Sequence, residues 1–156
     1  MAERLIQLQN IHKQYGEKTV LENLNLYVKD KEFVTLLGPS GCGKSTTLNL
    51  LSGLQTPTSG RIFFGEEDVT DLPPQNRGVG LVFQNYALYP HLTVRQNILF
   101  PLQNLKGKDK PSKEDMERRA LEAAKLVQID GLMERKPAEL SGGQQQRVAI
   151  ARALVK

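Results

Sequence analysis

Apolar residues in the first half of the chain recur with the two-residue period of β-strands. Ile6–Ile11 and Leu24–Val28 alternate apolar with polar residues, as half-buried strands do. Phe33–Leu37 is instead a continuous apolar run that ends at a glycine, which is typical of a strand buried on both faces of a sheet. Two further strands are predicted at Arg61–Phe64 and Val79–Gln84.

Helical spacing is first met at Thr46–Leu54, where Leu48, Leu50 and Leu51 are predicted to point inward and Gly53 lies near the helix end. Three further helices are predicted at Thr93–Asn104, at Ser112–Val127 and from Ser141 to the end. Residues 56–60 and 72–76 are predicted to be loops, and the charged residues 107–111 a linker. Strands followed by helices predict one α/β domain that carries a helical sub-region.

The composition is that of a soluble globular protein, with 39% hydrophobic and 24% charged residues among 156. No apolar run is long enough to cross a membrane, and no signal peptide is expected at the N-terminus. The net charge of +4 raises the question of nucleic acid, but acidic residues interrupt the basic cluster at 106–119, which favours a solvated surface. Cys42 is the only cysteine, so an internal disulfide framework is excluded and a reducing compartment is expected.

Gly38–Ser45 reads G-P-S-G-C-G-K-S and fits the phosphate-binding loop G-x-x-x-x-G-K-[ST] between a predicted strand and a predicted helix. Glycines let successive backbone N–H groups face phosphate oxygens, and the helix N-terminus adds its positive dipole end. Lys44 can reach the β- and γ-phosphates, and the Ser45 hydroxyl can coordinate Mg²⁺. The alternative is a glycine-rich turn before an ordinary helix. Cys42 is either a reactive thiol at a helix N-terminus or a side chain that fills space.

A second motif lies at Leu140–Gln144, which reads L-S-G-G-Q. Ser141 and Gln144 are explained as a capping box at the start of a helix. The two glycines between them are not, because glycine in a helix costs about 1 kcal/mol relative to alanine. Close approach by a second phosphate group would explain them.

The L-S-G-G-Q motif, the following Gln145-Gln146-Arg147 and a P-loop about 100 residues upstream together resemble the ATP-binding-cassette (ABC) family. Tyr15 resembles the family's adenine-stacking aromatic residue, and Gln84 its Q-loop glutamine, which touches Mg²⁺ and the attacking water. Without that context, Tyr15 is a surface aromatic residue and Gln84 a polar strand end. Val82–His91 resembles the sugar-importer and polyamine-importer branches, and His91 lies too early to be the family's switch histidine.

The resemblance implies a P-loop NTPase-type α/β core with an N-terminal antiparallel β region and a helical subdomain. The implied parts are a nucleotide-binding core at about 1–84, a Q-loop and helical subdomain at about 85–140, and a signature helix at 141–156. Lys44 and Gln84 are the implied catalytic residues, and Ser45 and Gln84 the implied Mg²⁺ ligands. The implied ATP contacts are Tyr15, Gly38, Pro39, Ser40, Gly41, Cys42, Gly43, Lys44, Ser45 and Thr46, with Ser141, Gly142, Gly143 and Gln144 contacting the ATP of a partner subunit.

The resemblance also implies partners. These are a second nucleotide-binding subunit in a head-to-tail dimer, membrane permease subunits and, indirectly, an extracytoplasmic solute-binding protein. The expected location is cytoplasmic, on the inner face of the cell membrane, with no nucleic-acid partner. After the signature helix the family has a strand that ends in an Asp-Glu pair and then a switch histidine. The chain ends at Lys156 without these residues, so we expect a core that lacks its C-terminal part, MgATP binding with little or no hydrolysis, and an exposed apolar edge prone to association.

Two alternatives remain open. One is a soluble ABC ATPase that acts on nucleic acid or ribosomes, and the other is a non-catalytic module that dimerises on ATP. An unrelated P-loop kinase would leave Leu140–Gln144 unexplained. The sequence does not reveal the transported solute.

Overall fold

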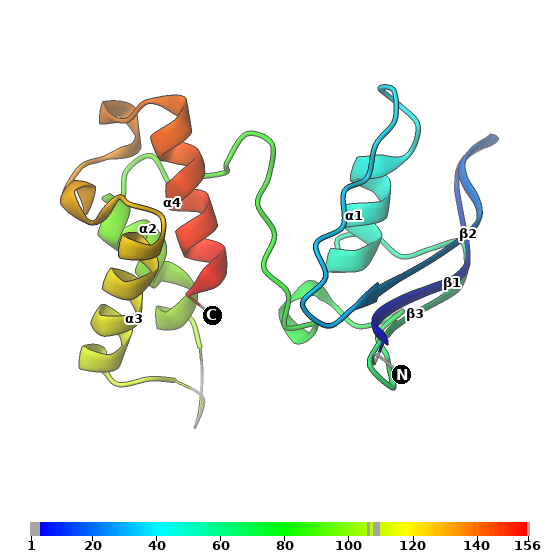
Figure 1. Ribbon diagram of the computed structural model, residues 1–156, viewed down its shortest axis with the longest axis horizontal. Helices are drawn as coiled ribbons and strands as arrows, with labels where there is room; N and C mark the ends of the chain where they lie inside the picture. Colours follow the sequence, from blue (N-terminus) through cyan, green and yellow to red (C-terminus); the bar gives the residue numbers. More distant parts are fainter. Residues whose placement is uncertain (1–3, 106, 108–109, 156) are drawn as a thin grey trace. The chain divides into compact units, whose positions relative to one another are not determined.

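The computed structural model describes residues 4–105, 107 and 110–155. The chain divides into two compact units, one that ends at Val79 and one that begins at Gly80. Among the described residues, the first unit contains a sheet and the α-helix α1, and the second contains the α-helices α2, α3 and α4 (Figure 1). Within the described part of the chain, no helix is both long and apolar enough to span a membrane.

The sheet of the first unit is antiparallel, with strand order β2-β1-β3-β4. Its strands are β1 (Arg4–Tyr15), β2 (Lys18–Lys29), β3 (Ser59–Phe64) and β4 (Glu67–Asp68). The predicted strands at 6–11, 24–28 and 61–64 are therefore confirmed. β1 and β2 extend beyond the alternating segments from which they were predicted. The N-terminal antiparallel β region of the expected fold is present.

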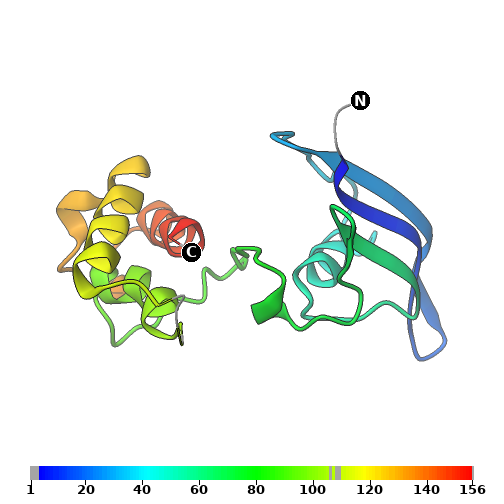
Figure 2. The ribbon, with the colours of Figure 1, turned by 90° about the horizontal axis from the view of Figure 1, so that it is seen from below.

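Helix α1 (Lys44–Ser52) packs against one face of this sheet (Figure 2). Leu50 is fully buried and Gly53 caps the helix C-terminus in a left-handed conformation, as predicted. Leu48 is 46% exposed, so its predicted inward direction is wrong. Leu48 lies two residues before Leu50 and therefore points to the opposite side of the helix. Thr47, three residues before Leu50, shares its face and is buried. The core of this unit is made by Leu8, Ile11, Leu21, Leu50, Ile62 and Val69.

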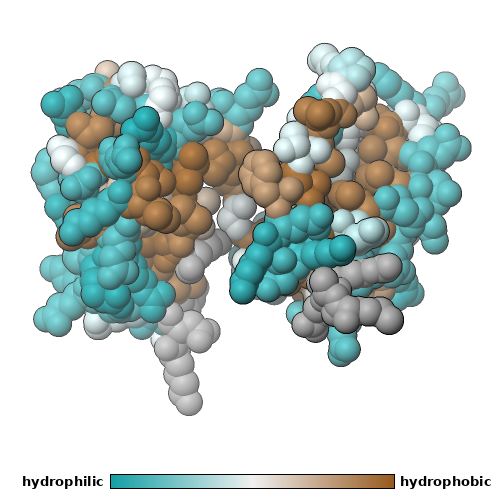
Figure 3. Space-filling model, viewed as in Figure 1, coloured by the Kyte–Doolittle hydropathy of each residue, from teal (hydrophilic) through white to brown (hydrophobic). Residues whose placement is uncertain are grey.

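Two predicted strands are absent from the structure. Phe33–Leu37 forms no strand, and Phe33 and Leu37 are 93% and 88% exposed rather than buried. Val79–Gln84 likewise forms no strand, and Phe83 is 42% exposed. A strand requires a hydrogen-bonded neighbour, and within the described ranges the sheet comprises only β1 to β4, none of which pairs with either segment. Apolar surface remains visible on both units (Figure 3).

The second unit packs α2 (Val94–Gln103), α3 (Lys113–Leu126) and α4 (Gly142–Leu154) around one core. Thr93, Ser112 and Ser141 are the N-cap residues, and each side chain accepts a hydrogen bond from a backbone N–H in the first turn. The three predicted helices are confirmed to within one or two residues. Short 3₁₀ turns lie at Pro74–Asn76, Asp130–Leu132 and Pro137–Glu139. The predicted linker at 107–111 falls partly outside the described residues.

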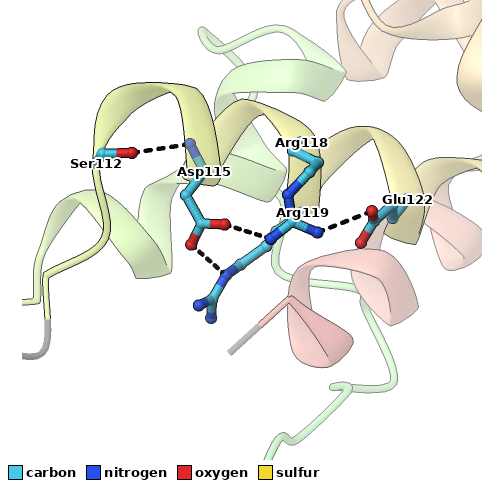
Figure 4. Close-up of polar contacts among 5 residues, drawn as sticks. All are labelled: Ser112, Asp115, Arg118, Arg119 and Glu122. Carbon is cyan, nitrogen blue, oxygen red and sulfur yellow. Dashed lines mark hydrogen bonds and ion pairs between the residues drawn. The ribbon is translucent and has the colours of Figure 1, made fainter.

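The first turns of α3 carry a network of ion pairs (Figure 4). The Ser112 hydroxyl accepts a hydrogen bond from Asp115 N at 3.1 Å, and the Asp115 carboxylate pairs with Arg118 and with Arg119 Nε at 2.8 Å. Arg118 also pairs with Glu122 at 2.9 Å. The hydrogen bond from Arg118, with the charges of both arginines, lowers the pKa of the Asp115 carboxyl below its usual value of 3.8. These charged residues form a solvated helix face, as the sequence indicated.

Candidate nucleotide-binding site

The P-loop leads into the N-terminus of α1. Gly41 and Gly43 have φ values of +80° and +78°, a left-handed conformation that glycine adopts without steric cost. Gly43 is the N-cap residue, and because it has no side chain it supplies no cap hydrogen bond to the first N–H groups of the helix. A helix N-terminus of this kind offers N–H donors and the positive end of a dipole, which together suit an anion.

Gly43 is also required for space, whereas Gly38 has only the exposed Cys42 side chain as a close neighbour. A Cβ atom placed on Gly43 would lie 2.7 Å from Leu21 Cδ2 and 3.0 Å from Val20 O, on the strand beneath the loop. A Cβ atom on Gly38 would lie 2.6 Å from Cys42 Sγ. Cys42 is exposed and does not belong to the core of the first unit.

Lys44 is held close to the loop backbone. Its ammonium Nζ donates to Gly38 O at 3.0 Å and to Pro39 O at 3.1 Å, and lies 3.9 Å from Cys42 Sγ. These acceptors are the neutral carbonyls of the loop itself. A phosphate oxygen is a stronger acceptor for an ammonium because the hydrogen bond is charge-assisted on both sides. The lysine is thus already placed over the loop in which a phosphate would sit.

Tyr15 lies at the end of β1, in the same unit as the P-loop. Its hydroxyl donates a hydrogen bond to Gln55 Oε1, and the Lys13 ammonium lies 4.9 Å from the ring centroid. Lys13 Nζ also donates to Thr56 O at 2.8 Å, which fixes its position. Tyr15 is 43% exposed, and its ring is held at the hydroxyl end, which suits it to stack on a planar base.

Ser45 is the residue of the P-loop whose side chain could bind Mg²⁺. This residue is exposed in the first turn of α1, next to Lys44, and its hydroxyl is a hard oxygen donor. Over residues 4–105, 107 and 110–155, no group of three His, Cys, Asp or Glu residues could hold a metal ion. Mg²⁺ usually takes one or two protein oxygens and completes its shell with phosphate and water, so Ser45 fits such an ion.

The L-S-G-G-Q motif forms the start of α4 in the second unit. Gln144 N donates to Ser141 Oγ at 3.3 Å, and Ser141 N donates to Gln144 Oε1 at 2.9 Å, so the predicted capping box is present. Gly142 and Gly143 are exposed, and a Cβ atom on either would meet no described atom within 4 Å. No contact within the described chain therefore requires these two glycines.

Gln84 lies exposed in a turn of the second unit. The turn is closed by a hydrogen bond from Tyr86 N to Phe83 O at 2.9 Å. The predicted site residues thus fall into two groups: Tyr15 and 38–46 in the first unit, and Gln84 and 141–144 in the second.

Two buried polar residues, Arg77 and Asn97, and the half-buried Arg152 were not predicted from the sequence. Arg77 is 5% exposed and holds the C-terminus of α1, Asn97 is fully buried in α2, and Arg152 lies on α4. Desolvation lowers the pKa of the guanidinium groups of Arg77 and Arg152 below the usual value. Asn97 could have been noticed, because it shares a helix face with Val94 and Ile98, where an apolar residue is expected.

The chain is similar in sequence to known proteins along most of its length. A family model described as ABC transporter matches residues 21–156. The xylose/arabinose import ATP-binding protein XacJ of Haloferax volcanii is 50% identical over 151 residues, which cover 97% of this chain and 39% of that protein. The spermidine/putrescine import ATP-binding protein PotA of Mannheimia succiniciproducens is 48% identical with the same coverage. The maltose/maltodextrin import ATP-binding protein MalK of Salmonella typhimurium is 51% identical, over 96% of this chain and 40% of that protein. The chain thus spans about two fifths of the length of these relatives.

The fold is likewise similar to solved structures. The dimeric structure of MJ0796, a bacterial ABC transporter cassette, matches with a TM-score of 0.84 at 42% identity, over 96% of this chain and 69% of that chain. A post-hydrolysis state of the same cassette, bound to ADP and Pi, matches with a TM-score of 0.83. The α/β fold expected from the P-loop and the L-S-G-G-Q motif is confirmed by these matches, and the chain belongs to the ABC transporter family.

Proposed function

We propose that this chain binds MgATP as part of an ABC import ATPase. The observation that carries the proposal is the P-loop: left-handed glycines, a helix N-terminus without a side-chain cap, and Lys44 already bonded over the loop. These features supply N–H donors, a dipole and a positive charge to one anion. The phosphates of ATP match that combination, and Tyr15 would receive the adenine.

Bound Mg²⁺ would neutralise charge on the β- and γ-phosphates. Ser45 would hold it through the side-chain oxygen, and Lys44 would exchange its two carbonyl acceptors for phosphate oxygens. Gln84 would contribute its side-chain amide toward Mg²⁺ and the attacking water. The 156 residues contain no acidic residue after Glu139. We propose that these 156 residues, taken alone, bind MgATP much better than they hydrolyse it.

A second nucleotide-binding subunit would complete the site. Gly142 and Gly143 are open on the surface at a helix N-terminus, and nothing else in the described chain needs their lack of a side chain. In a head-to-tail dimer, Ser141–Gln144 of one subunit would close over the ATP of the other. The similar cassette MJ0796 has a dimeric structure, which supports the proposal of a dimer.

The proposed setting is an import complex at the inner face of the cell membrane. The relatives named above are import ATP-binding proteins for sugars and polyamines, and each is close to half identical in sequence. The segment from Gln84 through α2 would receive the permease, and a solute-binding protein would act on the other side of the membrane. These relatives differ in the solute that their names give, so we assign no solute class to this chain.

The dimer can be tested with a pair of matched glycine variants. Gly142→Glu places a carboxylate where the partner's ATP would approach, while the same change at the exposed Gly131 does not. A glutamate in the first turn of a helix is favourable, so folding should be retained. In sedimentation velocity, we expect MgATP to produce a dimer of the wild type and of Gly131→Glu but not of Gly142→Glu. An equal response of all three chains would contradict the proposed role of the signature motif.

A further inference from the structure

The turn that carries Gln84 continues into an unusual backbone segment. Tyr86 and Ala87 have φ values of +60° and +45°. Residues with a side chain rarely adopt this left-handed region, and two in succession are rarer still. Such a segment persists only where surrounding contacts hold it.

Arg152, in the last turn of α4, makes two of those contacts. Its guanidinium donates to Ala87 O at 2.7 Å and to Tyr86 O at 2.9 Å, so both strained residues are held by one side chain. The same guanidinium lies 5.6 Å from the ring centroid of Tyr89. The planar group with several N–H donors suits this task, because it can bond two carbonyls at once.

The far end of the segment is fixed independently. Asn97 is fully buried in α2, where its Oδ1 accepts from Tyr89 N at 2.9 Å and its Nδ2 donates to Tyr89 O, Leu92 O and Thr93 O at 3.0–3.1 Å. The Tyr89 ring also packs on Phe100 of the same helix, with centroids 4.4 Å apart. The segment from 86 to 93 is therefore attached to α4 at one end and to α2 at the other.

We propose that Arg152 is a positioning residue for Gln84. Gln84 lies in a turn whose closing residue, Tyr86, is the residue that Arg152 holds. Arg152 belongs to α4, the helix that begins at the L-S-G-G-Q motif. The same contact therefore links the Gln84 turn to that helix, and a movement of the turn would be passed to the helix. The role of Gln84 itself rests on the proposed function, but the attachment does not.

The test is amide hydrogen exchange by NMR on the whole chain without nucleotide, so that its result does not depend on ATP binding. Arg152→Met removes both donors, and Arg147→Met makes the same change at an exposed arginine of the same helix. We expect the amides of Tyr86 and Ala87 to exchange about tenfold faster in Arg152→Met, while the buried amide of Val148 changes less than about twofold. Arg147→Met should leave all three rates unchanged.

Arg152→Lys guards against a variant that merely destabilises the helical unit. Lysine keeps the charge and the alkyl stem but not the two-pronged geometry, so Tyr86 and Ala87 should exchange about threefold faster with Val148 unaffected. Unchanged rates at Tyr86 and Ala87 in both variants would overturn the proposal. So would equal acceleration at Tyr86 and Val148 in both, because the arginine would then support the helices as a whole. If the selective effect is seen but MgATP does not bind, the attachment stands and the proposed function fails.

Discussion

Replacing Arg77 by methionine should strongly lower the free energy of unfolding of the first unit. The guanidinium is 5% exposed and donates to four backbone carbonyls. Nη1 bonds Leu50 O at 2.7 Å and Leu51 O at 3.2 Å, Nε bonds Leu72 O at 2.8 Å, and Nη2 bonds Thr70 O at 2.9 Å. Two of these carbonyls belong to the last turn of α1, where a cation also complements the helix dipole.

The size of the effect follows from what the carbonyls lose. A hydrogen bond to a charged donor contributes about 1.5–3 kcal/mol, and a buried acceptor left without a donor costs about 1–3 kcal/mol. Desolvation of the guanidinium, which lowers its pKa, offsets part of this. Methionine fills most of the volume, so little cavity cost is added. We expect a loss of about 3 kcal/mol in the free energy of unfolding, within a range of about 2–5 kcal/mol.

Urea unfolding followed by circular dichroism measures this loss. With a slope of about 1.5–2 kcal/mol per molar urea, the transition midpoint of the first unit should fall by about 1.5–2 M. Arg61→Met is the matched control, because Arg61 makes an exposed ion pair with Asp68 and its side chain is 70% exposed. Such a pair contributes less than about 1 kcal/mol. Equal losses for the two variants would refute the reasoning from buried carbonyls.

Three further predictions concern the loop, α3 and the exposed apolar run. Gly43→Ala should abolish MgATP binding in a fluorescence titration, because φ is +78° and the new Cβ would lie 3.0 Å from a backbone carbonyl oxygen; wild-type affinity would contradict this. Asp115 has a folded pKa lowered chiefly by Arg118, so its stabilising effect is present above its usual value of 3.8 and is lost as the pH falls through the folded pKa. Asp115→Asn should therefore lower Tm near pH 6 and leave Tm unchanged well below pH 3.8, whereas a constant difference at both pH values would count against the ion pair. Phe33 and Leu37 are 93% and 88% exposed, so replacing both by serine should reduce the concentration-dependent self-association that light scattering measures. Unchanged self-association would show that these side chains do not mediate it.

The helices were predictable because their signals are local. Thr93, Ser112 and Ser141 each form the cap that their residue type indicates, within one residue of the predicted start. The P-loop and the L-S-G-G-Q motif were predictable for the same reason: each combines a residue pattern with a helix N-terminus in one short segment. The parts of β1 and β2 at 6–11 and 24–28 were predictable from the alternation of apolar and polar residues.

What could not be predicted depends on contacts distant in sequence. Phe33–Leu37 has the pattern of a buried strand, but a pattern does not supply the neighbouring strand that would bury it. Arg77 and Arg152 were missed because their partners are backbone carbonyls, which leave no residue pattern to recognise. The inward direction assigned to Leu48 failed because the sheet covers only the side of α1 that carries Thr47 and Leu50.

Calorimetric titration of MgATP into the purified chain, beside Lys44→Ala and the surface control Lys18→Ala, tests whether the P-loop is a working nucleotide site. Lys44 Nζ is held over the loop by two carbonyls and should transfer to phosphate oxygens on binding. Loss of charge-assisted bonds that contribute about 1.5–3 kcal/mol should weaken binding about 10- to 150-fold. We predict saturable binding by the wild type and by Lys18→Ala, with that loss in Lys44→Ala. No binding by the wild type, or equal affinity in all three chains, would show that the loop does not hold the phosphates of ATP.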